Sequence, residues 1–491
     1  MTGNAASPAT LTISETDPYD FGQVADGGTA QHTFIVQNIG GVNATTLSGA
    51  LPNADYDFAG GTFPGTGAVC PLPIVPLGTC EVIVDFNPTA VAAINDTLTV
   101  NYNNGVIPQS VDRNIIGEGV SPAVLTITDA GGFDFTQVAN GSLNDHTFTV
   151  SNSGAVPATL FNEDAPLTAP FEYRGGGGFP GAGGTCGPLV SVGSSCTLVV
   201  SYNPTGPLAV HNDVLELTYF DGVSTLDIDV NITGESVAPG NIIVQEGLTH
   251  NFNDIAVGGI AETTFTLEND GDVDVTSMNG LGIDPPYRFT DGSCPGNGGD
   301  CGLVLAPTAT YTIVVTFEPP SVNNFLDTVN INYNDGAAPQ TTSIALSGDG
   351  ADPAVLTIAE IEPFDYNPQT VDSVTPHIFV VSNTGDVEAT GLAITSLVAP
   401  FNFAGGAFPG TGSATPCTST LAAGATCDLV VEYSPVTTGL HLNSIDLAYN
   451  DGVTAQVEVQ TLRGTGLSRA CLLYTSPSPR DQRGSRMPSS A

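Results

Sequence analysis

The chain has 491 residues, with 50 Asp or Glu, 8 Arg and no Lys, which gives a formal net charge of −42. Such a surface repels phosphate backbones and anionic lipids, which excludes nucleic acid as a partner. Hydrophobic residues make up 41% of the chain, enough for several cores, but no apolar run is long enough for membrane insertion.

One sequence pattern recurs four times at intervals of about 115 residues. Each copy opens with a strand of alternating apolar residues that ends in Asn and a glycine turn. Alternation with a period of two predicts a strand with one buried face. The four strands are Phe34–Asn38, Phe148–Asn152, Phe265–Asn269 and Phe379–Asn383, and the glycines are Gly40, Gly154, Gly271 and Gly385.

A glycine-rich loop with Phe-Pro-Gly follows and leads to a second alternating strand, Cys80–Phe86 in the first copy. Glycine-rich stretches such as Gly175–Gly178 resemble phosphate-binding loops, but neither a Lys nor a helix follows them. The pattern therefore favours a structural loop that crosses between two sheets. Loops of this kind are also where we expect contacts with a partner.

A late alternating strand, Leu98–Tyr102 in the first copy, is followed by Asn-Asn-Gly or a related turn. Such turns need positive φ and signal a β-hairpin. The sequence shows no helical stripe longer than about ten residues. We therefore predict an all-β chain of four tandem immunoglobulin-like β-sandwich domains, with roughly seven strands in each.

The predicted domains are repeat 1 (8–119), repeat 2 (120–236), repeat 3 (237–350) and repeat 4 (351–467). Short joints that end in Pro122, Pro239 and Pro353 separate them, and proline stiffens the entry to the next domain. Short joints favour an elongated array, a rod on the order of 150 Å if each domain spans about 35–40 Å.

Cysteines lie ten residues apart in repeats 1, 2 and 4. In repeat 3, Tyr311 takes the place of the second Cys, and Cys294 takes the place of the Phe in Phe-Pro-Gly. One loss and one nearby gain indicate pairing, although spacing alone does not fix connectivity. We predict four intradomain disulfides: Cys70–Cys80, Cys186–Cys196, Cys294–Cys301 and Cys417–Cys427. The alternatives are buried free thiols and zinc ligands, and zinc usually requires closer pairs.

The last stretch, 468–491, differs from the rest because it is rich in Ser, Pro and Arg and contains the odd Cys471. It resembles translated sequencing-adapter read-through, and a natural disordered tail is the alternative. The segment Met1–Ala6 has neither a basic start nor an apolar run. Because disulfides imply an oxidising compartment, we expect an internal piece of an exported protein, located outside the cell or at its surface.

Histidines recur at strand positions rather than in a catalytic arrangement. His32, His146 and His377 share one position, which is Thr263 in repeat 3, while His211 and His441 share another and His250 stands alone. A catalytic residue would not be expected to recur in three modules and become Thr in the fourth. We therefore predict no enzymatic activity, no catalytic residue and no cofactor.

Clustered carboxylates raise the possibility of calcium binding. Asp270, Asp272 and Asp274 alternate along the chain, but the segment lacks the Gly and the terminal Glu of an EF-hand loop. The three residues are thus a weak calcium candidate. Asp221, Asp335 and Asp451 lie in hairpin turns, where Asp is favoured for backbone reasons alone.

The motifs resemble a known module. Phe-x-Val-x-Asn with its glycine turn, Cys-x-Val-x-Val-x-Phe-x-Pro, Tyr-Asn-Asp-Gly and a closing Gly-x-Gly are similar to the choice-of-anchor D repeat of bacterial surface proteins. That module is in turn similar to the abnormal-spindle/Hydin type of immunoglobulin-like domain. The resemblance covers about residues 8–467, and implies multi-repeat extracellular proteins that act in adhesion or as spacers.

The resemblance therefore implies a non-enzymatic structural or adhesive stalk of an exported bacterial surface or secreted protein. Its partner would be an unidentified protein or glycan at the cell surface. Two alternatives stay open at this point. One is an intracellular scaffold module of the Hydin type, against which the paired cysteines speak. The other is a glycan-binding module of a larger protein, for which the absence of Trp is unfavourable.

Overall fold

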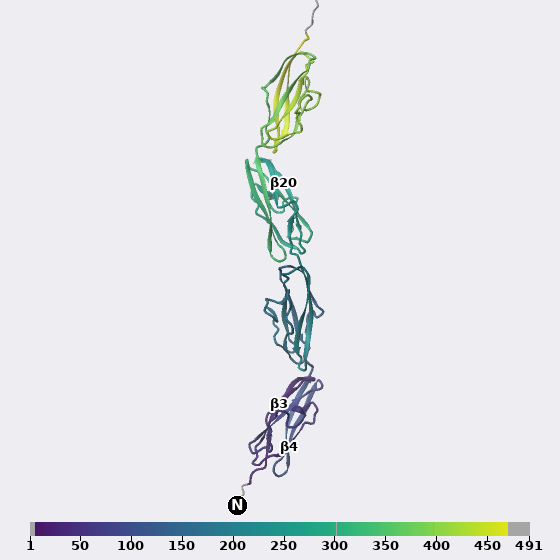
Figure 1. Cartoon of the computed structure of the whole chain (residues 1–491), viewed down its shortest axis with the longest axis vertical. Coiled ribbons are helices and arrows are strands. Elements are labelled where there is room, and N and C mark those ends of the chain that lie inside the picture. Colours follow the sequence, from purple (N-terminus) through teal and green to yellow (C-terminus); the bar gives the residue numbers. More distant parts are fainter. Residues whose placement is uncertain (1–4, 301, 396, 470–491) are drawn as a thin grey trace, which may run out of the picture. The chain divides into compact units, whose positions relative to one another are not determined.

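A computed structural model describes residues 5–300, 302–395 and 397–469. Eight sheets, two for each repeat, make up this part of the chain (Figure 1). The strands of repeat 1 are β1 (Leu11–Ile13), β2 (Tyr19–Ala25), β3 (Ala30–Asn38), β4 (Thr45–Ala50), β5 (Tyr56–Phe58), β6 (Thr79–Phe86), β7 (Ala92–Asn103) and β8 (Pro108–Val120). A 3-10 turn, η1 (Ala59–Gly61), follows β5.

Repeat 2 has the same order with one additional short strand. Its strands are β9 (Leu125–Ile127), β10 (Phe133–Ala139), β11 (Asn144–Asn152), β12 (Ala158–Glu163), β13 (Phe171–Tyr173), β14 (Leu189–Val190), β15 (Ser195–Tyr202), β16 (Val210–Phe220) and β17 (Thr225–Val237).

Repeats 3 and 4 follow the order of repeat 2. Repeat 3 contains β18 (Ile242–Val244), β19 (Thr249–Ala256), β20 (Ala261–Asn269), β21 (Val275–Leu281), β22 (Tyr287–Phe289), η2 (Thr290–Gly292), β23 (Val304–Leu305), β24 (Thr310–Phe317), β25 (Asn323–Asn334) and β26 (Pro339–Ala351). Repeat 4 contains β27 (Leu356–Ile358), β28 (Phe364–Thr370), β29 (Thr375–Asn383), β30 (Ala389–Ile394), β31 (Phe401–Phe403), β32 (Thr420–Leu421), β33 (Thr426–Tyr433), β34 (Gly439–Asn450) and β35 (Ala455–Leu467).

The prediction of roughly seven strands was too low, since the described residues form eight strands in repeat 1 and nine in each other repeat. The additional strands, such as β5 and β14, have only three and two residues. Segments this short cannot show an alternating pattern, so periodicity does not reveal them.

The two sheets of a repeat pair their strands in the same way throughout. In repeat 1 the sheet orders are β1-β3-β6-β5 and β2-β8-β7-β4. All pairs in this repeat are antiparallel except β2 with β8, which run parallel from Tyr19 opposite Ile115 to Ala25 opposite Val120. The corresponding parallel pairs in the other repeats are β10–β17, β19–β26 and β28–β35.

The inward faces of the two sheets form the core, as the alternation predicted. Cys80, Val82, Val84 and Phe86 of β6 all have an exposure of 0%. Four hydrophobic clusters result, one for each repeat, but Ala25 packs with the cluster of repeat 2 and Ala256 with that of repeat 4.

The described chain also divides into two compact units. The first contains the residues up to Gly240 together with Gly271–Asp274 and Asp335–Ala338, and the second contains the remaining residues. Repeats 1 and 2 therefore belong to the first unit, and most of repeats 3 and 4 to the second.

Candidate functional site

A buried asparagine ends the early strand of every repeat. Asn152, at the end of β11, is 1% exposed, and its Nδ2 donates to the carbonyl oxygens of Val156 and Val190 at 2.9 and 3.1 Å. Its Oδ1 accepts hydrogen bonds from the amides of Val124 and Gly154 at 3.3 and 2.9 Å. One amide thus joins the start of β9, the turn after β11 and strand β14 of the opposite sheet.

The equivalent asparagines are equally buried. Asn38 donates to Val42 and Ile74, and Asn383 donates to Val387 and Leu421. Asn269 donates to the carbonyl of Leu305 and accepts from the amide of Asn241. A position that the sequence shows only as the polar end of a strand is therefore a hydrogen-bonded tie between the two sheets.

Three of the four predicted disulfides are present: Cys70–Cys80, Cys186–Cys196 and Cys417–Cys427. In repeat 2, Cys196 lies in β15 of one sheet, and Cys186 lies in the segment that leads to β14 of the other. The disulfide therefore closes the segment that contains β14 and ties the end of the glycine-rich loop to β15.

The fourth predicted pairing involves Cys301, which lies outside the described residues, as does Cys471. Cys294, the predicted partner of Cys301, is half-buried and packs against the core of repeat 3. We expect peptide mapping of the non-reduced protein to recover Cys294 linked to Cys301. Recovery of Cys294 as an alkylated thiol would contradict the pairing, and the Cys186–Cys196 peptide serves as the positive control.

The Phe-Pro-Gly loop is held by the core and by the sheet edge, as the structural interpretation predicted. Phe179 contacts the ring of Phe161 edge-on at 5.4 Å between centroids. The carbonyl of Pro180 accepts a hydrogen bond from the amide of Val199 in β15 at 2.8 Å. The loop thereby covers the edge of the sheet that β15 helps to form.

Three of the recurring histidines bridge the two sheets instead of facing a pocket. His146 of β11 stacks on Phe133 of β10, with ring centroids 3.5 Å apart, and its Nε2 lies 2.9 Å from Oδ2 of Asp129. His377 stacks on Phe364 and pairs with Glu360 in the same way. His32 stacks on Tyr19 and lies 3.6 Å from Glu15.

The sequence suggested that His250 stands alone, but the structure places it at a position that recurs in the other repeats. It lies opposite Leu346 in β26, the register position that Phe133 occupies opposite Ile232 in repeat 2. There it contacts Phe252 and Phe265 edge-on. Repeat 3 therefore carries its histidine on the partner strand and has Thr263 where the other repeats have His.

Burial lowers the pKa of His250 below its usual value of 6.5. The unfolded chain then binds the proton more readily, so the stabilisation is fully present above pH 6.5 and is lost as the pH falls through the folded-state pKa. We expect the urea midpoint of repeat 3 to fall between pH 7.5 and pH 5, and His250→Phe to flatten this dependence. An unchanged slope in the variant would contradict the assignment.

A stacked pair of aromatic rings fills the same place in each repeat and carries one hydroxyl group. In repeat 2, Phe171 packs on Tyr202, and the Tyr202 hydroxyl lies 2.8 Å from Nδ1 of His211. In repeat 1 the hydroxyl is on the other ring, because Tyr56 packs on Phe86 and donates to the carbonyl of Ile94 at 3.0 Å. Repeat 4 resembles repeat 2, and repeat 3 resembles repeat 1.

These stacks explain the first glycine of the closing Gly-x-Gly and the shared position of two histidines. His211 and Ile94 occupy the same register position, opposite Gly234 and Gly117. A Cβ on Gly234 would lie 2.8 Å from the ring of Tyr202, so only glycine fits. Burial also raises the pKa of Tyr202, and raises that of Tyr287 to about 12, so both hydroxyls stay neutral.

Removal of the Tyr202 hydroxyl is expected to destabilise repeat 2. Tyr202→Phe leaves His211 without this partner, which should cost about 1–2 kcal/mol of unfolding free energy. The triple variant F171Y/Y202F/H211I recreates the arrangement of repeat 1 and should recover most of that loss. Urea titration followed by hydrogen exchange in peptides of repeat 2 measures both; a triple variant less stable than Tyr202→Phe alone would contradict the exchange of roles.

The acidic residues of the hairpin turns accept hydrogen bonds from backbone amides, as predicted. Oδ1 of Asp221 accepts hydrogen bonds from the amides of Val223 and Ser224, each at 2.7 Å. Burial would raise the pKa of Asp451, but hydrogen bonds from Thr454, Val453 and the Gln456 side chain outweigh burial and hold that pKa below its usual value. These carboxylates therefore stabilise turns.

The weak calcium candidate lies in an exposed turn. Asp270, Asp272 and Asp274 are all exposed, and Oδ2 of Asp272 accepts a hydrogen bond from the amide of Ala238 at 3.0 Å. Among the described residues, no three His, Cys, Asp or Glu side chains are arranged to hold a metal ion. Calcium binding at these aspartates stays a prediction. Within the same residues, no helix is long and apolar enough to cross a bilayer.

No family model and no curated protein matches the sequence. Among solved structures, the protocadherin GammaB4 extracellular domain matches with a TM-score of 0.28 and 9% identity, over 94% of this chain and 67% of that one. The ICAM-5 ectodomain fragment matches with a TM-score of 0.27 and 10% identity, over 94% and 100%. The PapD-like domain of human CEP192 has a TM-score of 0.19 and 16% identity, over 23% and 87%.

At such low sequence identities, similarity to a solved structure is informative about the fold alone. Because all three TM-scores lie below 0.5, the fold is assigned from the chain's own sheets and strand pairing. The described residues form tandem immunoglobulin-like β-sandwiches, and their regular secondary structure is almost entirely β.

Proposed function

We propose that this chain is a non-enzymatic structural and adhesive stalk segment of an exported bacterial surface protein of the choice-of-anchor D type. One observation carries the proposal: the conspicuous polar side chains recur from repeat to repeat and are used inside each repeat. Asn152 ties the sheets, Asp221 holds a turn, His146 bridges two strands and Tyr202 bonds His211. What remains for function is length and exposed surface.

Separately folding domains are part of this proposal, with the boundaries 8–119, 120–236, 237–350 and 351–467. Four hydrophobic clusters that follow the four repeats support it. A chain of such domains with short joints would act as a spacer. Small-angle scattering should therefore show the maximum dimension falling by about 35–40 Å when repeat 2 is deleted together with its joint. An unchanged dimension would contradict the spacer role.

The disulfides support export over an intracellular scaffold of the Hydin type, because thiols stay reduced in the cytosol. Rapid alkylation of the protein in its source cells, followed by mass analysis, tests this point. We expect Cys70, Cys186 and Cys417 to be protected from alkylation until a reductant is added. Immediate alkylation of all three would favour the scaffold. A glycan array would test whether the adhesive partner is a glycan. Binding of the purified chain to the array would identify the glycan.

A further inference from the structure

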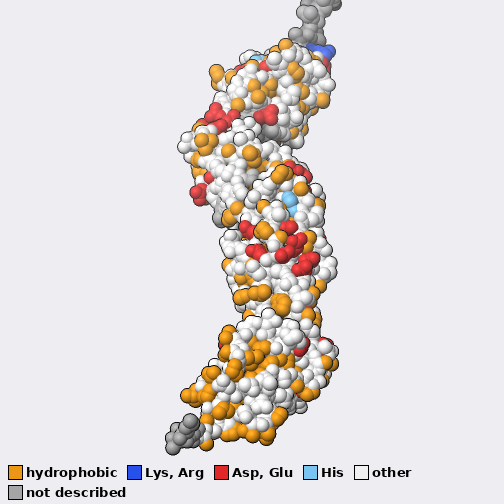
Figure 2. Space-filling model, turned by 60° about the horizontal axis from the view of Figure 1, so that its bottom comes forward, with side chains coloured by type: hydrophobic (Ala, Val, Ile, Leu, Met, Phe, Trp, Pro, Cys, Tyr) orange, Lys and Arg blue, Asp and Glu red, His pale blue; other side chains and the backbone are white. Residues whose placement is uncertain are grey.

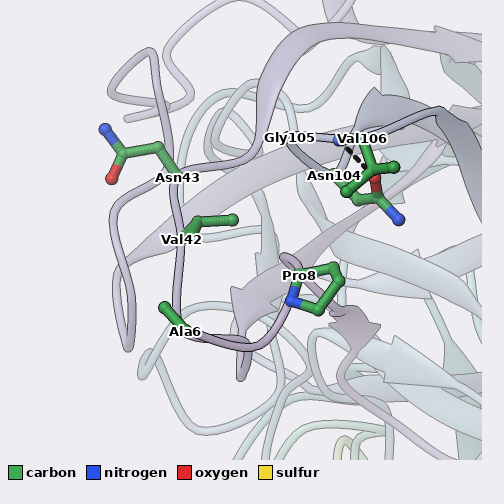
Figure 3. Close-up of a pocket in the computed structure, with 7 residues that line it drawn as sticks. All are labelled: Ala6, Pro8, Val42, Asn43, Asn104, Gly105 and Val106. Carbon is green, nitrogen blue, oxygen red and sulfur yellow. Dashed lines mark hydrogen bonds between the residues drawn. The ribbon is translucent and has the colours of Figure 1, made fainter. Parts of the chain in front are cut away.

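One end of repeat 1 presents an exposed, mainly apolar surface. The surface consists of Ala6, Pro8, Val42, Gly105 and Val106, and we call it the open end of repeat 1. With Asn43 and Asn104 these residues line a hollow of about 500 Å³ (Figure 3). Figure 2 shows hydrophobic side chains gathered over the visible face of this repeat.

The equivalent surface of repeat 2 is covered by repeat 1, within the first compact unit. Gly222 of the hairpin turn contacts Ala25, since a Cβ built on Gly222 would lie 2.9 Å from the Ala25 Cβ and 3.2 Å from Val156. A Cβ on Gly28 would lie 2.7 Å from the carbonyl oxygen of Gly222. The turn that follows β2, Ala25-Asp-Gly-Gly28, therefore sits directly on the hairpin turn of the next repeat.

The same contact recurs inside the second compact unit. There Ala256 lies against Gly452, and a Cβ on Gly452 would lie 2.9 Å from the Ala256 Cβ and 3.2 Å from Val387. A Cβ built on Gly259 would lie 2.8 Å from the carbonyl oxygen of Gly452. The two joints have the same residues and nearly the same distances, so the contact between one repeat and the next follows one pattern.

Exposure distinguishes the covered surfaces from the open one. Val223 and Val453, which lie beside the covering turns, are each 39% exposed, whereas the equivalent Val106 of repeat 1 is 72% exposed. Ala6 is exposed, whereas Val120 at the equivalent position before repeat 2 is 5% exposed. Repeat 1 thus has the residues of the receiving surface but leaves them in solvent.

The segment before repeat 1 matches the joint between repeats 1 and 2. Gly3-Asn-Ala-Ala-Ser-Pro8 aligns with Gly117-Glu-Gly-Val-Ser-Pro122, which forms the end of the last strand of repeat 1 and the joint itself. The shared Gly and Ser-Pro show that residues 3–8 have the sequence of a joint between repeats.

A second copy of this chain fits the open end less well. Its free turn would be the one after β28, where Thr370 replaces Ala25 and Asp372 replaces Gly27. Thr370 is exposed, and Asp372 forms an ion pair with Arg469 at 2.5 Å. A β-branched side chain would clash where an alanine is received, and docking would desolvate a charged group.

We propose that the open end of repeat 1 binds the Ala-x-Gly-Gly turn of another sandwich repeat of this kind, joined ahead of Ser7. Pro8, Val42 and Val106 receive the alanine and the glycines of that turn, as Val156 and Val223 do in repeat 2. This inference builds on the proposed spacer role, but the spacer role does not depend on it, because four repeats would still act as a stalk.

The test adds a second copy of residues 237–351 directly ahead of Ser7 in the full chain. Repeat 3 supplies a natural donor turn, Ala256-Val-Gly-Gly259, while the segment around residues 104–107 remains unique to repeat 1. We expect hydrogen exchange of residues 104–107 to slow by about tenfold, towards the rate of the covered turn 221–224, since burial reduces local opening.

The matched control places Ala256→Thr and Gly258→Asp in the added copy only, which introduces the residues that repeat 4 carries at these two positions. This control should leave the exchange of residues 104–107 fast. Equal exchange with and without the added repeat, or equal slowing by the control, would overturn the proposal.

Sedimentation of the unmodified chain tests whether a second copy of this chain occupies the open end of repeat 1. We expect a monomer at all concentrations. End-to-end oligomers that dissociate on Val106→Asp would instead identify a second copy as the partner and overturn the proposal. Failure of the spacer role would appear in the deletion experiment and would leave these exchange results unchanged.

Discussion

Asn152→Leu is expected to lower the unfolding free energy of repeat 2 by about 4 kcal/mol, because two buried carbonyls and two half-buried amides lose their partner. Those groups are the carbonyls of Val156 and Val190 and the amides of Val124 and Gly154. Leucine has a similar size, so the loss reports the hydrogen bonds more than a cavity. The effect is large because a buried group without a partner costs more than a hydrogen bond gains.

Hydrogen exchange in increasing urea, read on peptides of repeat 2, measures this loss for one repeat at a time. Asn152→Asp keeps the shape but presents a carboxylate to two carbonyl oxygens, so it should destabilise the repeat as well. Ser153→Ala is the matched control, because its hydroxyl forms an exposed hydrogen bond to Val124. The control should stay within about 0.5 kcal/mol of the parent. A loss below 1 kcal/mol for Asn152→Leu would contradict the role of the asparagine.

The second large effect concerns the disulfide of repeat 2. The double variant Cys186→Ala/Cys196→Ala should lower the unfolding free energy of repeat 2 by about 3 kcal/mol. The unfolded chain gains entropy when the disulfide no longer closes a short loop. The parent protein treated with a reductant should lose the same amount in repeat 2.

Reductant supplies the control within the same experiment. The double variant should not respond to reductant in peptides of repeat 2, while peptides of repeats 1 and 4, which keep Cys70–Cys80 and Cys417–Cys427, should still respond. A double variant as stable as the oxidised parent would show that the loop is held by Phe179 and Pro180 alone, contrary to this expectation.

The sequence was informative wherever a local pattern corresponds to a local contact. The ten-residue spacing of Cys186 and Cys196 predicted a disulfide that the structure contains, and the alternation in β6 predicted which side chains are buried. Turn chemistry likewise predicted the role of Asp221. In each case the interacting groups lie within about a dozen residues, so their spacing carries the information.

Contacts between distant residues were not predictable in this way. Asn152 bonds groups 28 and 38 residues away, and no spacing rule connects them. The place of His250 in β19, at the position that Phe133 occupies in β10, depends on strand register, which the sequence of one strand does not determine. Comparison of the repeats contains the signal: Tyr202 occurs with His211, whereas Phe86 occurs with Ile94.

The parallel pairing of β2 with β8 has a mechanical consequence. β2 lies near the start of repeat 1 and β8 ends it, and the two run side by side from Tyr19 opposite Ile115 to Ala25 opposite Val120. Tension between the two ends of the repeat would draw these strands along their length in opposite directions, so their hydrogen bonds would be sheared together instead of being unzipped singly. Forced unfolding is governed by the unfolding rate, so resistance to a pull comes from this strand pair more than from equilibrium stability.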